Sequence, residues 1–147
     1  MRFQLTELSS PSVDIAEELD SLIIDVNRVL GDEVGRWVLS ADHHDAQSEL
    51  SLFVAETQKQ LVVGRTFIDA QTGIRWIIDY KTSRPADETP LTDFFSEEAA
   101  RYRDQLMRYR SAMQLYDQSH HPDVVDARVA LYFPALAELY ELPIHEA

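Results

Sequence analysis

The chain contains no cysteine, which excludes disulfide bonds and zinc sites built from thiolates. It has no apolar run of about 18 residues, so no membrane-spanning helix and no membrane partner are expected. Residues 1–7 lack the apolar core of a signal peptide, and with the absence of cysteine this favours a cytoplasmic location.

Positive charge is also scarce, because 13 Lys and Arg stand against 26 Asp and Glu and give a formal net charge of −13. Phosphate affinity depends on Lys and Arg, so this composition argues against a free-standing DNA-binding protein. A local DNA site stays possible for two reasons. A nuclease site is itself acidic before its metal binds, and a module of a larger assembly can leave DNA capture to its neighbours.

With 147 residues, 45% of them hydrophobic, the chain is long and apolar enough for one domain over residues 1–147. Apolar residues at helical spacing predict a helix over 11–30 that ends at Gly31. Alternating patterns and turn signals predict strands, of which the three from 48 to 81 are expected to form an antiparallel meander. The expected strands are 36–39, 48–55, 61–68, 74–81, 125–133 and 136–142. A second helix is expected to run from a cap at Thr92 or Asp93 to about 116.

Residues 76–83 are the most informative segment. In a strand, side chains alternate between faces, so Asp79 and Lys81 point the same way as Ile77, while the residues between them point the other way. Two charged groups at the end of an apolar strand cost desolvation free energy. That cost is tolerable if the charges pair with each other, or if they hold a metal ion and a substrate oxyanion.

Three features follow one another along the chain: Glu49 on one expected strand, Asp79-x-Lys81 on another, and Tyr102-x-x-Gln105-x-x-x-Tyr109 on the next helix. In this order they resemble the RecB-like nuclease domain of the PD-(D/E)xK superfamily. The likeness covers roughly residues 29–142 and is greatest to the C-terminal portion of UvrD/Rep-type helicase-nucleases. The phosphate-binding motif of a helicase motor is absent, so the chain is read as a detached module, a fragment of a longer protein or a stand-alone relative.

The resemblance implies an α/β fold with a restriction-endonuclease-like mixed β-sheet flanked by helices. It implies Mg²⁺ or Mn²⁺ held by Asp79 and Glu49, with Lys81 assisting the water and the phosphate during phosphodiester hydrolysis in DNA. Gln105, Tyr109 and Tyr102 would line the site and contact the substrate. The implied partners are DNA and a helicase subunit or domain, in DNA repair or recombination.

One position departs from the family pattern, which usually has a metal-binding Asp directly before an Arg on the preceding strand. Here Gly64 precedes Arg65, and the nearest acid, Asp69, faces away in a regular strand. Two hypotheses therefore stay open: a nuclease domain impaired by Gly64, or a catalytically inactive module for DNA positioning or protein interaction. A third, an acidic adaptor, rests on net charge alone.

The adjacent histidines at 43–44 and 120–121 are not expected to bind a metal. Both pairs lie in polar, loop-like stretches, and adjacent side chains point apart on a strand or a helix.

Overall fold

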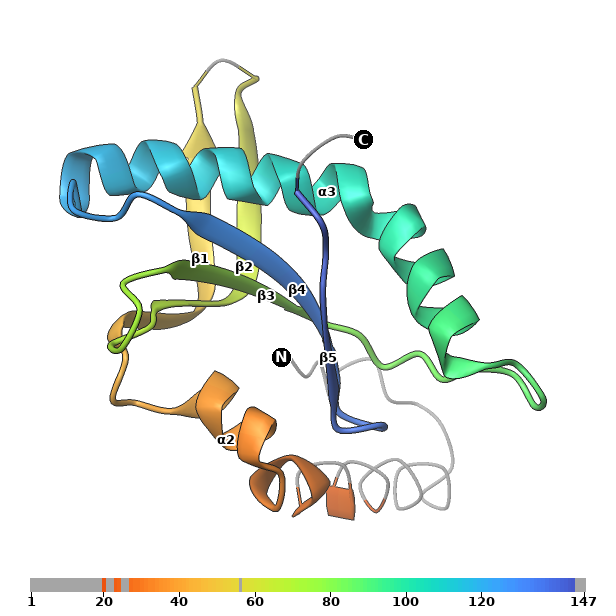
Figure 1. Cartoon of the computed structure of the whole chain (residues 1–147). Coiled ribbons are helices and arrows are strands. Elements are labelled where there is room, and N and C mark those ends of the chain that lie inside the picture. The colour runs from red at the N-terminus through yellow and green to blue at the C-terminus, as the bar shows by residue number, and fades with distance from the viewer. Residues whose placement is uncertain (1–19, 21–22, 25–26, 56, 145–147) are drawn as a thin grey trace, which may run out of the picture.

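The computed structural model describes residues 20, 23, 24, 27–55 and 57–144, which contain a five-stranded mixed sheet with helices packed on it (Figure 1). The strand order is β1-β2-β3-β4-β5, and all neighbours are antiparallel except β3 and β4. The elements are α2 (Glu33–Leu39), β1 (His44–Val54), β2 (Lys59–Ile68), β3 (Arg75–Tyr80), α3 (Leu91–His120), β4 (Ala127–Phe133) and β5 (Glu138–Glu141). The expected α/β class, a mixed sheet flanked by helices, is confirmed.

The first three strands form the predicted antiparallel meander. The turn between β2 and β3 contains Gly73 at φ 73°, a left-handed conformation that glycine adopts without strain. The parallel pair β3 and β4 is joined through α3, because parallel neighbours require a crossover connection. β5 lies at the sheet edge, within the stretch 136–142 that was predicted as a strand.

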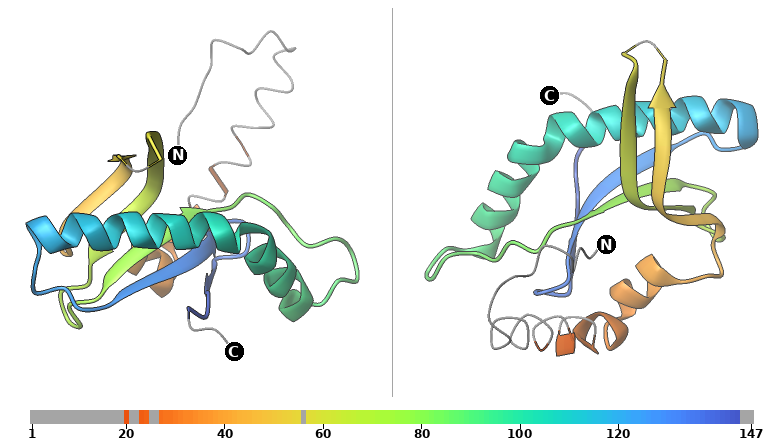
Figure 2. Two further views of the ribbon diagram at one scale, coloured as in Figure 1. Left: turned by 90° about the horizontal axis from the view of Figure 1, so that it is seen from above. Right: turned by 180° about the vertical axis from the view of Figure 1, so that it is seen from behind.

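The two faces of the sheet carry different cores, and α2 and α3 cover opposite faces (Figure 2). Ile77 and Leu131 pack against α3, in a cluster with Leu106 and Met113 of that helix. Ile78 packs on the other face with Val38 of α2. The predicted alternation in β3 is confirmed, and it places Asp79 on the α3 face.

The prediction of a strand at 36–39 is wrong, because these residues belong to α2. Asp32 caps the helix by accepting a hydrogen bond from the Gly35 amide at 2.8 Å. Gly35 also lets the helix approach closely, since a Cβ there would lie 2.4 Å from the Val29 carbonyl oxygen. Most of the expected helix at 11–30 lies outside the described residues, but its last turn ends at Gly31 as predicted.

Several predicted boundaries are also wrong. α3 follows Pro90, which makes no side-chain capping bond, instead of starting from a cap at Thr92 or Asp93, and it continues to His120. β1 begins at His44, four residues before the predicted start. In both extensions an acid binds Arg75 of β3, Asp117 near the end of α3 and Asp45 near the start of β1.

Candidate functional site

Asp79 and Lys81 lie together where β3 ends beneath α3. Lys81 Nζ is 3.0 Å from Asp79 Oδ2, and each side chain is 18% exposed. The backbone amide of Lys81 donates to the Tyr132 carbonyl at 2.9 Å, so the chain continues alongside β4 past the end of β3. The two predicted side chains are therefore held on one face by continued pairing of the backbone.

α3 supplies the opposite wall of this site. The ammonium of Lys81 lies 3.7 Å from the centre of the Tyr102 ring, a close cation–π contact. One turn further along, the Gln105 side-chain amide donates to the Tyr109 hydroxyl at 2.7 Å. Tyr109 is buried against the sheet, so this pair is fixed to the protein core and Tyr102 is fixed to the charged pair.

Asp79 Oδ2 is buried and has no hydrogen-bond partner among the described residues. The Lys81 ammonium is close to it but is not aligned to donate. A buried carboxylate oxygen without a donor is costly unless a cation lies nearby. This oxygen therefore suits a contact with a cation, whether that is the lysine or a metal ion.

Glu49 lies on the same transverse line of the sheet as Asp79. The pairs on either side place Glu49 opposite Gly64, and the β2–β3 register continued by one residue places Gly64 opposite Asp79. With about 4.8 Å between neighbouring strands, the backbones of Glu49 and Asp79 are roughly 10 Å apart. Position 64 is therefore between the two acids, and there the chain has no side chain.

The alternation of β1 is reset at Glu49, which adopts φ 52°. Ser48 Oγ accepts a hydrogen bond from Arg65 on the α2 face, whereas Leu50 packs into the core beneath α3. In a regular strand these two residues would share a face. Sequence alternation alone therefore does not fix the direction of the Glu49 side chain.

Position 64 has room for a larger residue. A Cβ on Gly64 would meet the Ile78 carbonyl oxygen at 3.5 Å and Tyr80 Cδ2 at 3.6 Å, both ordinary contact distances. No steric reason excludes a larger residue at 64, and its Cβ would lie beside Tyr80, whose ring packs on the α2 face. Asp69 does not replace the family-like acid at 64, because it lies in the β2–β3 turn and accepts a hydrogen bond from the Thr72 hydroxyl at 2.9 Å.

The metal-ligand set is incomplete as it stands. Among the residues that the structure describes, no three His, Asp or Glu side chains are grouped to hold a metal ion. Mg²⁺ binds through one or two carboxylates when substrate phosphates and waters complete its shell. The structure brings Asp79 and Lys81 together, whereas in the described part of the chain Glu49 makes no hydrogen bond or ion pair with either of them, so Asp79 is the one carboxylate placed for that weaker arrangement.

Glu98 is a buried acid that the sequence interpretation treated only as a helix-start residue. It is 4% exposed, accepts a hydrogen bond from the Ser83 hydroxyl, and lies 3.6 Å from an Arg101 nitrogen. Its contact with Ser83 ties the segment after Lys81 to α3. A signal was present, because 98, 102, 105 and 109 follow helical spacing on one face.

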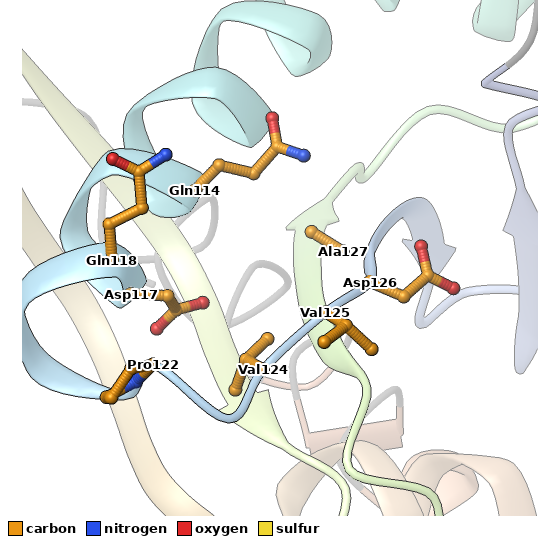
Figure 3. Close-up of a pocket in the computed structure, with 8 residues that line it drawn as sticks. All are labelled: Gln114, Asp117, Gln118, Pro122, Val124, Val125, Asp126 and Ala127. Carbon is orange, nitrogen blue, oxygen red and sulfur yellow. The ribbon is translucent and has the colours of Figure 1, made fainter.

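A different hollow, of about 330 Å³, lies between the end of α3 and the chain entering β4 (Figure 3). Two acids line it, Asp117 and Asp126, and Asp117 is bound to Arg75, at 3.0 Å from Nε and 2.6 Å from an Nη. Burial opposes the charge of Arg75, but Asp117 and Asp45 overcome this and raise its pKa. This hollow contains none of the predicted site residues.

No protein-family model matches the chain, and no curated protein matches it either. None of the helices in the described part of the chain is both long and apolar enough to cross a bilayer.

Proposed function

We propose that this chain is a RecB-like, PD-(D/E)xK-type nuclease domain with a restriction-endonuclease-like fold, which acts on DNA in the cytoplasm as part of a helicase-nuclease. The observation that supports this most directly is the Asp79–Lys81 pair at the end of a central strand, covered by Tyr102. A mixed sheet whose parallel pair is joined by α3 is consistent with it.

Each residue of the proposed site has its own role. Lys81 is held by Asp79 and Tyr102, so its ammonium is fixed to stabilise negative charge on an attacked phosphate. Gln105 and Tyr109 shape the wall of α3 against the substrate strand. Asp79 and Glu49 would hold Mg²⁺ or Mn²⁺, which when bound supplies an activated water and neutralises phosphate charge.

Gly64 limits this activity, because it leaves one carboxylate missing between Glu49 and Asp79. Losses even outside the first ligand shell cost about 10–100-fold in metal affinity or activity, and this one is within that shell. The same gap favours a second candidate function, a catalytically inactive module that positions DNA or a protein partner.

Metal binding and DNA cleavage together test the proposal. We expect Mn²⁺ titrated by calorimetry to bind weakly, with slow cleavage of plasmid or linear DNA, and Asp79→Asn to abolish both. Gly64→Asp is expected to raise Mn²⁺ affinity and cleavage about tenfold or more. Asp123→Asn, an exposed acid outside the site, is the matched control for the loss of one charge and should change neither.

The two candidate functions give different results. No heat and no cleavage from the natural sequence, with both gained in Gly64→Asp, identify the inactive module. Cleavage unchanged by Asp79→Asn, with the fold verified by circular dichroism, would eliminate the site. If no variant binds Mn²⁺ in the calorimeter and none retards DNA in a gel-shift assay, only the acidic adaptor is left.

A further inference from the structure

His43 lies on the α2 face of the sheet, opposite the face that carries Asp79. Its ring stacks on Phe67 with centroids 4.0 Å apart and planes at 9°, and it meets the Trp37 ring edge-on at 5.8 Å. Only 6% of the side chain is exposed. The imidazole is therefore locked in one orientation by aromatic neighbours.

The hydrogen bond at Nε2 fixes the tautomer of the neutral ring. Nε2 is 2.7 Å from the Trp37 carbonyl oxygen, which can only accept, so Nε2 carries the hydrogen. Nδ1 then presents a lone pair, and this buried atom has no hydrogen-bond partner in the described part of the chain. This tautomer therefore leaves the Nδ1 lone pair buried and without a hydrogen bond among the described residues.

A carboxylate oxygen lies near this lone pair. His43 Nδ1 is 3.8 Å from Asp69 Oδ1, and the Asp69 side chain is 14% exposed. Asp69 is itself held in place, because Oδ1 accepts from the Gln71 amide at 3.3 Å and Oδ2 from the Thr72 hydroxyl at 2.9 Å. Two fixed, electron-rich atoms face each other, and a cation between them would satisfy both.

The surroundings of this pair are acidic. His43 and Asp69 line a hollow of about 360 Å³ that is also lined by the exposed acids Glu33 and Asp42. Arg36 also lines the hollow, and its positive charge disfavours a bound cation. Its guanidinium donates a hydrogen bond to the Leu30 carbonyl at 3.0 Å. Three carboxylates against one guanidinium leave the hollow acidic.

We propose that His43 Nδ1 and Asp69 Oδ1 bind a divalent transition-metal ion of the Zn²⁺ class, with water completing its shell. Imidazole and carboxylate ligands suit Zn²⁺, Co²⁺ and Ni²⁺, whereas Mg²⁺ and Mn²⁺ favour oxygen ligands. With bonds of about 2.1 Å to each atom, one ion can span up to roughly 4.2 Å, so 3.8 Å is within reach after a small closure. The bound ion ties the segment before β1 to the β2–β3 turn, independently of the proposed nuclease site.

Zn²⁺ and Co²⁺ titrations of the full chain, free of any affinity tag, test this site. We expect one equivalent of Zn²⁺ by calorimetry, a raised melting temperature, and visible absorption bands when Co²⁺ is used. His43→Gln keeps an amide donor for the Trp37 carbonyl but removes Nδ1, and Asp69→Asn removes the carboxylate charge from an exposed turn. Each is expected to weaken Zn²⁺ binding about tenfold or more.

The matched control is His44→Gln, because His44 is adjacent and exposed. It should leave Zn²⁺ affinity and the Co²⁺ spectrum unchanged, and Asp79→Asn should do the same. Zn²⁺ binding that is equal in His43→Gln, Asp69→Asn and the natural sequence would overturn the proposal. Stabilisation by acid alone, with no effect of Zn²⁺, would also overturn it, since the cation would then be a proton on His43.

Discussion

The hydroxyl of Tyr132 is buried beneath α2 and has no hydrogen-bond partner among the described residues. An unsatisfied buried hydroxyl costs about 1–3 kcal/mol of desolvation. Tyr132→Phe removes that group and keeps the ring that packs edge-on against Tyr80. We expect the substitution to raise the free energy of unfolding by about 1 kcal/mol at pH 7, measured by urea denaturation.

The control for this change is Tyr140→Phe on the edge strand β5, where the side chain is half-buried. It should change the free energy of unfolding by a few tenths of a kcal/mol at most. Loss of stability in Tyr132→Phe would mean that the hydroxyl is satisfied in solution by a bound water.

The same residue makes stability sensitive to alkaline pH. Burial raises the pKa of Tyr132 to about 12, helped by the negative charges of Asp32 and Glu138, and burial raises the pKa of Tyr80 to about 12. In the unfolded chain both would lose their protons near the ordinary pKa of 10.0. Between these values the unfolded state binds fewer protons, so the free energy of unfolding falls as pH rises.

We therefore expect ionisation of these two tyrosines to leave the urea midpoint unchanged below about pH 10 and to lower it from there toward pH 12. In Tyr132→Phe the fall should be shallower, because one titrating group is gone. An equal slope in both proteins would show that Tyr132 does not resist ionisation.

Local periodicity explains which side chains of the candidate site could be predicted. Asp79 and Lys81 share a face because the two-residue repeat of a strand needs only the neighbouring sequence, and their charged groups lie 3.0 Å apart. Glu49 was beyond this reasoning, because its left-handed backbone resets the alternation of β1. Glu98 was passed over because a glutamate near a helix start has an ordinary explanation in the helix dipole.

Among the secondary-structure elements, β1, β3 and α3 are joined by one buried guanidinium. Arg75 is fully buried and binds Asp117 of α3, Asp45 of β1 and, at 3.4 Å, the Thr66 hydroxyl of β2. Removing one partner of such a network leaves a buried charge unpaired, at a cost of about 3–5 kcal/mol. The elements are thus coupled through a residue whose role the sequence does not reveal.

We expect Arg75→Met to lower the free energy of unfolding by about 3–5 kcal/mol, because Asp117 is only 3% exposed. The double variant Arg75→Met/Asp117→Leu should recover most of that loss, since no unpaired charge remains on α3. Arg128→Met, which breaks exposed pairs with Asp126 and Glu141, should cost at most about 1 kcal/mol. Urea denaturation of the four proteins measures all three differences, and a double variant as unstable as the single one would contradict the charge argument.

Element type was predictable where the pattern was long and failed where it was short. In the antiparallel strands and in α3, the apolar pattern repeats several times with one period. Residues 36–39 are only four, and they fit a strand or a helix equally well. What decided in favour of α2 was the Asp32 cap and the close approach at Gly35, which involves Val29 and Tyr132. Tertiary contacts of this kind cannot be seen in a short sequence window.

For the chain as a whole, the dominant physical quantity is the net charge of −13. Self-repulsion of a highly charged chain destabilises its compact state, and it also repels the phosphates of DNA. The order of apolar patterns predicted the succession of helices and strands, whereas the α/β class with a mixed sheet was expected from the family resemblance. The effect of charge on stability depends on how many acids are already paired, and composition alone does not give that number.

We expect added salt to stabilise this protein. At 0.1 M ionic strength, exposed charges more than about 10 Å apart are largely screened, so repulsion among the excess acids weakens while buried pairs such as Arg75–Asp117 persist. The melting temperature should therefore rise between 10 mM and 300 mM NaCl, and equally with KCl, which controls for a specific ion effect. Arg75→Met should show the same dependence on salt at lower absolute stability, because its missing contact is shielded from solvent. A melting temperature that falls with salt would mean that exposed ion pairs outweigh repulsion among the acids, and that the negative charge is not what limits stability.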